Sequence, residues 1–161
     1  MSVDRIYWRS VGLLNPEASG TTRGRVFIGS AIVFNVLVSA IYVFTKLDQM
    51  AVVGAIGVPI ILLMIPFTYT LMGFLKSNVE RRIIISNVVI IVYLLLELLL
   101  DFILLMPFRE ILVIHVPYIL VFYAAEFSMI GVSFKLNRGL GFVVLFTFFI
   151  LMGCLIFMYL G

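Results

Sequence analysis

Four acidic or imidazole side chains lie inside long apolar stretches of this sequence: Glu97, Asp101, His115 and Glu126. In hydrocarbon, an ionisable side chain costs about 2.5–3.5 kcal/mol on insertion scales, so each of these residues needs a functional or structural reason to be there. A carboxylate beside an imidazole can bind a proton near neutral pH and pass it on. These residue types therefore indicate a site for a proton, a cation or a small ligand.

Glu97 and Asp101 belong to a polar stripe on a helix built otherwise almost entirely of Ile, Leu and Val. At about 100° per residue, Ser86 and Tyr93 fall on the same face as the two carboxylates, and Asn87 flanks that face. In lipid, such a stripe has to face other helices or a water-filled cavity. We therefore expect it to point into the interior of a helix bundle.

The following helix has one polar face and one face of small residues. The polar face carries residues at positions i, i+3, i+7 and i+11, namely His115, Tyr118, Phe122 and Glu126. The opposite face carries residues that let helix backbones approach closely, namely Ala124, Ser128 and Gly131. We expect the polar face to look into the bundle and the small face to pack tightly, so that Gly131→Leu would disturb the packing.

Matching depths bring these two helices together into one candidate site. At 1.5 Å per residue, Asp101 and His115 lie about 7 Å and about 6 Å below the same membrane boundary. Glu97 lies one turn deeper, opposite the level of Tyr118. We expect Asp101 and His115 to be coupled across this site. The candidate residues for binding a ligand, proton or cation are Tyr93, Glu97, Asp101, His115, Tyr118 and Glu126.

A purely structural explanation stays open for these residues. Asp101 and His115 could form an interhelical ion pair that only fixes the packing. Glu126 lies about 12 Å from the opposite boundary and could pair with Lys135 or Arg138. No sequence motif for a metal triad, a phosphate loop or a nucleophilic serine is present, so we expect no catalytic residue, no metal and no cofactor.

The candidate site sits within a chain of five apolar runs, each longer than the roughly 18 residues that mark a spanning helix. The runs cover residues 26–44, 51–75, 83–106, 111–134 and 139–160. Hydrophobic residues make up 64% of the chain and charged residues 12%, against about 45–50% and about 25% in soluble domains. The sequence therefore predicts an all-α integral membrane protein, a bundle of five transmembrane helices with short loops.

Lys and Arg are distributed unevenly between the two sides of this bundle. Nine of them lie in the N-terminal segment and in the loops after helices two and four, and only Lys46 and Arg109 lie on the other side. The positive-inside rule then places the N-terminus in the cytoplasm and the C-terminus outside, as in a multi-pass protein of the cell membrane. Basic residues confined to loops do not form a nucleic-acid-binding face, so we expect the net charge of +3 to reflect topology.

Other segments carry weaker signals. Residues 1–25 form a cytoplasmic segment that can be either a short interfacial helix with a linker or a disordered tail, and residues 26–161 form one transmembrane domain. Pro59 and Pro66 are expected to kink helix two. Helix one offers Ala31, Asn35 and Ser39 as a packing face. Helix five is rich in phenylalanine without an ionisable group and is expected to face lipid, and the lone Cys154 excludes an internal disulfide.

Three functions fit these features. The first is transport, or the binding of a proton, cation or small ligand in a polar pocket between helices three and four. The second is a non-catalytic accessory or structural subunit whose polar stripe contacts a membrane-protein partner or a second copy of the chain. The third is an intramembrane enzyme that uses Glu97, Asp101 and His115, although the sequence favours a role that is not enzymatic.

Overall fold

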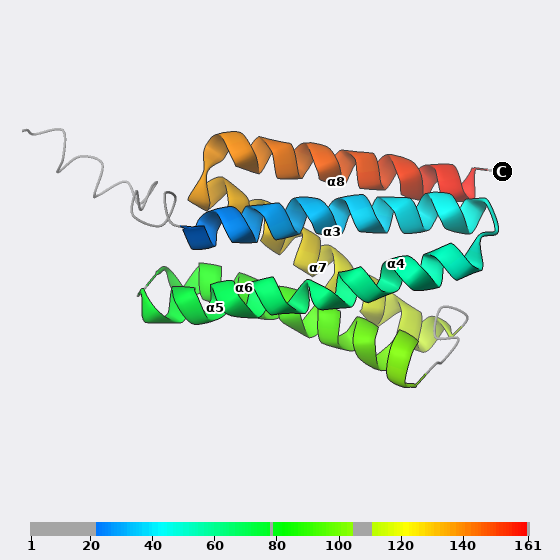
Figure 1. Ribbon diagram of the computed structural model, residues 1–161, viewed down its shortest axis with the longest axis horizontal. Coiled ribbons are helices and arrows are strands. Elements are labelled where there is room, and N and C mark those ends of the chain that lie inside the picture. The colour runs from blue at the N-terminus through cyan, green and yellow to red at the C-terminus, as the bar shows by residue number, and fades with distance from the viewer. Residues whose placement is uncertain (1–21, 78, 105–110, 161) are drawn as a thin grey trace, which may run out of the picture.

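The five apolar runs form helices in the structure (Figure 1), a computed structural model that describes residues 22–77, 79–104 and 111–160. Five helical segments are long and apolar enough to cross a membrane, as the sequence predicts. They are α3 (Thr22–Lys46), α4 with α5 (Met50–Leu62 and Met64–Lys76), α6 with the π-helix η1 (Arg81–Glu97 and Leu98–Ile103), α7 (Leu112–Leu136) and α8 (Arg138–Tyr159). No strand occurs in these ranges.

Helix α3 is the central element of the bundle. It packs lengthwise against α8, as Figure 1 shows, and also contacts α4, α5 and α7. Helix α7 passes between α6 and α8 and contacts both. The interior is filled by large apolar side chains such as Phe27, Phe34, Phe67 and Phe74, all buried. The expected packing face of the first span is confirmed, since Ala31, Asn35 and Ser39 are buried as well.

The first helix begins earlier than the sequence predicts. Thr22–Arg25 belong to α3 rather than to a linker, and the rest of the expected N-terminal segment lies outside the described residues. This turn is held against α5, because Arg23 Nη1 donates a hydrogen bond of 3.3 Å to the carbonyl of Gly73. A Cβ at Gly73 would lie only 2.4 Å from Arg23 Cδ, so glycine is what permits this approach.

The expected kink in the second span is present, and it divides the span into α4 and α5 at Leu63. Pro59 lies inside α4, where it removes a helix hydrogen bond, and Pro66 lies in the first turn of α5, where proline is tolerated. Of the residues of α4, only Ile60 is buried. Helix α4 therefore lies at the edge of the bundle and packs mainly against α3.

The third span changes from an α-helix to a π-helix after Glu97, which the sequence analysis did not anticipate. Residues Leu98–Ile103 adopt the wider turn, and Leu104 N donates to Leu99 O, five residues back, at 2.8 Å. Single π turns inside α-helices occur frequently at functional sites. The expected continuation to Met106 lies outside the described residues.

The expected tight packing of the small face of α7 is wrong. Ala124 and Gly131 are exposed, and a Cβ at Gly131 would meet nothing within 4 Å. The opposite face, with Ala125 and Met129 fully buried, is the one that meets α3 and α8. Small residues permit close packing, but they do not by themselves decide which face a neighbouring helix covers.

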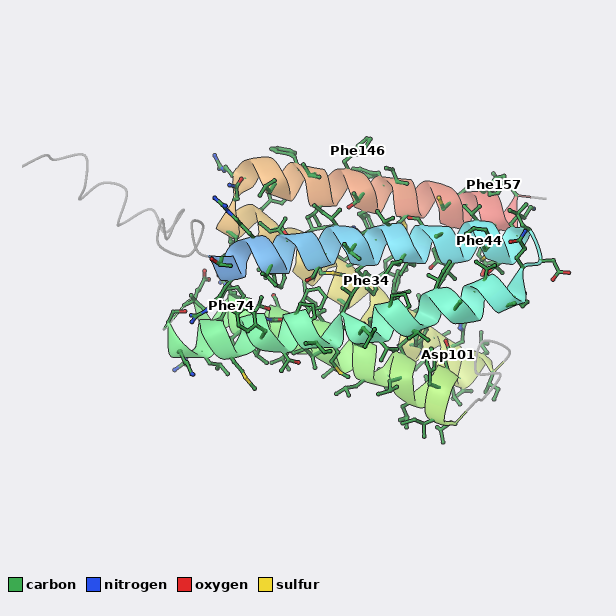
Figure 2. The ribbon with its side chains drawn as sticks, viewed as in Figure 1. Phe34, Phe44, Phe74, Asp101, Phe146 and Phe157 are labelled. Atoms are coloured by element: carbon green, nitrogen blue, oxygen red, sulfur yellow. The ribbon has the colours of Figure 1, made fainter. Side chains whose placement is uncertain are left out.

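Helix α8 is exposed on only one of its sides, so the expectation that the whole helix faces lipid is wrong. Phe146 and Phe157 point away from the bundle (Figure 2), but Phe148 is buried. Val144 and Leu151 are also buried, because this side of α8 packs against α3 and α7. An apolar helix without an ionisable group gives no sequence signal that distinguishes a side facing protein from a side facing lipid.

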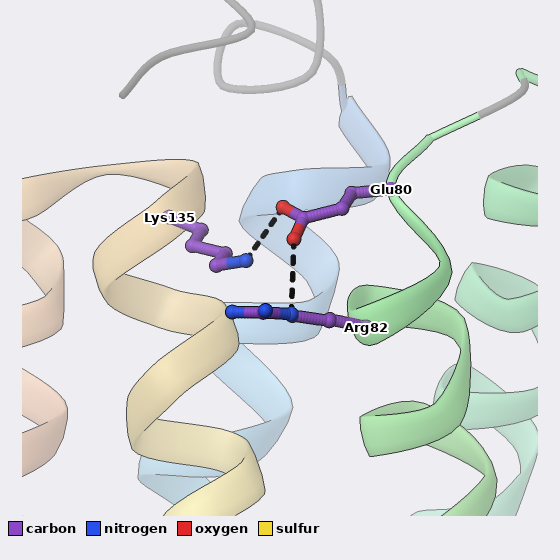
Figure 3. Close-up of polar contacts among 3 residues, drawn as sticks. All are labelled: Glu80, Arg82 and Lys135. Atoms are coloured by element: carbon purple, nitrogen blue, oxygen red, sulfur yellow. Dashed lines mark hydrogen bonds and ion pairs between the residues drawn. The ribbon is translucent and has the colours of Figure 1, made fainter. Parts of the chain in front are cut away.

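A surface ion-pair cluster joins the start of α6 to the end of α7 (Figure 3). Lys135 Nζ lies 2.5 Å from Glu80 Oε2, and Arg82 Nε lies 3.6 Å from Glu80 Oε1. The hydrogen bond from Lys135 is the main cause that lowers the pKa of Glu80 from its ordinary value of 4.5. Lys135 thus pairs with Glu80 and not with Glu126, the pairing that the sequence left open.

Glu80→Gln is expected to lower the thermal stability of the protein only slightly, because all three charged side chains are largely exposed to solvent. The pKa of Glu80 is depressed in the folded state, so its contribution to stability is present above pH 4.5 and is lost as the pH falls through the folded-state pKa. Thermal melting in detergent near neutral pH and under acid conditions measures this. A large loss of stability at neutral pH would show that the cluster contributes more than a surface ion pair.

Candidate functional site

A cavity of about 720 Å³ lies at the end of the bundle where α3 and α8 end and where α4 and α7 begin. Residues from all five spans line it, and its volume falls in the range of about 300–1,000 Å³ that is typical of ligand pockets. Five of the six predicted site residues are among those that line it, namely Tyr93, Glu97, Asp101, His115 and Tyr118. The part of the polar stripe that runs from Tyr93 to Asp101 therefore lines a cavity, whereas Ser86 does not.

Glu97 is a buried polar group at the wall of this cavity. It is buried at 8% exposure, and its Oε2 accepts hydrogen bonds from the hydroxyl of Tyr93 at 3.2 Å and from the hydroxyl of Tyr118. The two hydroxyl oxygens are 3.0 Å apart. The contact with Tyr118 confirms that Glu97 and Tyr118 lie at the same level on α6 and α7. A carboxylate with two phenol donors is fixed in orientation at the cavity wall.

The π-helix η1 brings two further side chains to the cavity, Asp101 and Phe102. Helix α4 approaches η1 closely at Gly57, where an added Cβ would lie 3.0 Å from Phe102 Cζ. Gly54, one turn away on α4, also lines the cavity, but a Cβ there would meet nothing within 4 Å. The glycine at position 57 is therefore the one that lets the Phe102 ring lie against α4.

His115 lies in the first turn of α7 and lines the same cavity as Asp101. Its ring is nearly parallel to that of Tyr118, with the centroids 6.4 Å apart and an interplanar angle of 15°. The hydrogen bonds and ion pairs of the described residues include none between His115 and Asp101, so the expected coupling of these two residues stays a prediction. Matching depths of Asp101 and His115 require a regular helix up to Asp101, whereas Asp101 lies on the wider turn of η1.

Several cavity residues had not been singled out from the sequence. Tyr42 on α3, Tyr123 on α7 and Tyr159 on α8 all line the cavity, and the two glycines of α4 contribute backbone. Tyr42 follows Asn35 and Ser39 at helical spacing, which could have placed it on the buried face of α3. An isolated tyrosine near the end of a spanning helix is also typical of the membrane interface, so the signal was not specific.

Glu126, the sixth predicted residue, does not line the cavity. It is fully buried one turn further along α7 than Phe122, which does. Asn87, suggested as part of a polar path with Glu126, instead donates to Phe67 O at 3.3 Å and to Thr70 Oγ1 at 3.1 Å. The structure thus joins Asn87 to α5 and leaves Glu126 in a separate interior position.

The ionisable side chains among the described lining residues include two acidic groups and one histidine. The acidic residues are Glu97 and Asp101, and no Lys or Arg is among the described lining residues. Throughout the described ranges, Lys and Arg occur only at the ends of helices. Those ranges also contain no group of three or more His, Cys, Asp and Glu side chains placed to hold a metal ion.

No protein-family model, curated protein or solved structure matches this chain. A functional proposal therefore depends on the geometry of the site alone.

Proposed function

We propose that this protein binds a small apolar cation in the cavity between α3, α4, α6, α7 and α8 and carries it across a cell membrane. The observation that supports this most is the position of Glu97, a buried carboxylate held by two tyrosines at the wall of a cavity of about 720 Å³. The cavity combines mostly apolar walls with a few convergent polar groups, which is the usual composition of a small-molecule site.

Aromatic side chains support a cation in particular. Tyr42, Tyr93, Tyr118, Tyr123 and Tyr159 line the cavity, and an aromatic face attracts a desolvated cation by about 2 kcal/mol or more. Negative charge on Glu97, held at the cavity wall by two tyrosine hydroxyls, adds to this attraction, and it opposes an anion of the same size and shape. The charge of the ligand is therefore the property that this cavity should discriminate most strongly.

Tetraphenylphosphonium and tetraphenylborate provide a direct test, because they have nearly the same shape and opposite charge. Calorimetric titration of the purified protein in detergent is expected to show binding of the cation at least ten times tighter than that of the anion. Glu97→Gln should weaken cation binding about tenfold or more, which corresponds to about 1.4 kcal/mol. Glu80→Gln makes the same chemical change at the surface and should have no effect on binding.

Two results would contradict the proposal: equal affinity for the two ions, or cation binding that is the same in Glu97→Gln and in the parent. Uptake of the cation into liposomes that contain the protein then separates transport from binding alone. Co-purification of a stoichiometric membrane-protein partner, without cation binding, would favour the accessory-subunit function instead.

The orientation that we propose has the N-terminus in the cytoplasm, supported by the nine-to-two bias of Lys and Arg. In that orientation the cavity opens toward the outside. Reporter fusions should place the turn around Lys46 outside and the turn between α5 and α6 inside. A reporter at Gly161 that is active on the cytoplasmic side would contradict this orientation.

A further inference from the structure

Glu126 lies in the middle of the bundle against an asparagine from another helix. Glu126 on α7 and Asn35 on α3 are both fully buried. One end of the Asn35 side-chain amide lies 3.0 Å from Glu126 Oε2 and 3.1 Å from Glu126 Oε1. The other end lies 2.9 Å from Thr147 Oγ1 on α8 and 3.4 Å from the carbonyl of Val144. The oxygen and nitrogen of an amide are assigned to its two ends by the hydrogen bonds that each would make.

With Glu126 ionised, the hydrogen bonds require one orientation of the amide. The Asn35 nitrogen faces Glu126 and donates to its carboxylate, which can only accept. The Asn35 oxygen then faces Thr147 and accepts from its hydroxyl at 2.9 Å. The buried charge is stabilised by charge-assisted hydrogen bonds, and no polar end of the amide is left without a partner.

With Glu126 protonated, the opposite orientation of the Asn35 amide also gives both of its ends a hydrogen-bond partner. The carboxylic acid now has a hydrogen to donate, and the Asn35 oxygen can accept it at the same end of the amide. The Asn35 nitrogen donates to Thr147 Oγ1, and the Thr147 hydroxyl donates to the carbonyl of Val144 at 2.8 Å. The same atom positions therefore hold either protonation state, with the amide turned by half a rotation and the threonine hydroxyl redirected.

We propose that Glu126, Asn35 and Thr147 form a proton-binding switch in the interior of the bundle, in which uptake of a proton by Glu126 turns the Asn35 amide. The amide of Asn35 presents an acceptor and donors at opposite ends of one flat group, so a half-turn exchanges them. The switch does not depend on the cavity holding a cation.

Other titratable groups near the pair come from several helices, and none of those described is a lysine or arginine. Tyr42 on α3 interacts electrostatically with Glu126, and also with Tyr123 on α7, Glu97 on α6 and Tyr159 on α8. The described basic residues lie at helix ends. Within the described chain, the polar partner of Glu126 is therefore an amide rather than a cation.

The side-chain amide resonances of asparagine report this switch directly in a sample labelled with ¹⁵N-asparagine. The chain has five asparagines, of which Asn87 is a built-in control, since it is buried and donates to Phe67 O and Thr70 without a carboxyl partner. The Asn35 resonances, identified by their loss in Asn35→Leu, should move with pH along a single titration curve. Those of Asn87 should stay in place.

Glu126→Gln is nearly isosteric and keeps an amide partner for Asn35, so it should remove the movement of the Asn35 resonances with pH. The infrared carbonyl band of a protonated carboxylic acid that is present in the parent and missing in Glu126→Gln should appear with the same midpoint. Asn35 resonances that do not move with pH in the parent would overturn the switch. Movement that persists unchanged in Glu126→Gln, or an infrared band with a different midpoint, would overturn it as well.

Discussion

Gly141→Leu is expected to lower the stability of the folded bundle strongly, because position 141 is where the backbones of α7 and α8 approach each other. A Cβ at Gly141 would lie 2.8 Å from Phe134 Cα and from two atoms of the Phe134 ring. Backbone atoms cannot move aside as a flexible side chain can, so leucine would push the two helices apart. Overpacking typically costs about 1–3 kcal/mol, and we expect at least the upper part of that range.

Gly153→Leu is the matched control for this prediction, since it makes the same change on the same helix. A Cβ at Gly153 would meet nothing within 4 Å, and Gly131 on α7 is equally open. Gly153→Leu and Gly131→Leu should both give folded protein with a melting temperature near that of the parent. Melting in detergent that is the same for Gly141→Leu and Gly153→Leu would show that α7 and α8 do not pack as described.

Gly57→Leu is expected to lower the affinity for tetraphenylphosphonium by more than tenfold while leaving the bundle folded. The first added carbon would already lie 3.0 Å from Phe102 Cζ, the far end of a side chain that can turn aside. The rest of the leucine would occupy space in the cavity that Gly57 lines. The variant thus removes room for a ligand without changing the charge of the site.

Gly54→Ala serves as the control for this second prediction, because Gly54 lines the same cavity and its added Cβ would meet nothing within 4 Å. It should bind the cation almost as the parent does. Calorimetric titration of the two variants and of the parent measures the difference. Unchanged affinity in Gly57→Leu would place the cation elsewhere on the protein, even if Glu97→Gln were to weaken its binding.

Helical periodicity predicted the features of the fold that depend on one helix at a time. The five apolar runs, the inward direction of Glu97 and the burial of Phe122 and Glu126 follow from spacing along a single helix, because lipid tolerates polar groups only on a face covered by protein. The prediction that Glu97 and Tyr118 lie at the same level came from the short turn between the third and fourth spans and from the rise per residue.

Features that depend on contacts between distant segments could not be predicted in this way. The exposure of Gly131 and the close approach at Gly141 are set by where neighbouring helices lie, although both glycines look alike in sequence. The change to a π-helix after Glu97 alters the direction of Asp101, and nothing in the apolar run around it marks that change. The pairing of Asn35 with Glu126 joins positions that share no local pattern.

Helix α4 separates the cavity from the surroundings of the bundle by the thickness of a single helix. One side of α4, with Gly57 and Ile60, lines the cavity, while Val58 and Leu62 are 50% and 56% exposed on the other. In a bilayer, that outer side touches acyl chains. A ligand that passes α4 arrives from the lipid phase, so its partition coefficient sets the concentration that the site experiences. Potency in a homologous ligand series would then follow solubility in the membrane as well as fit.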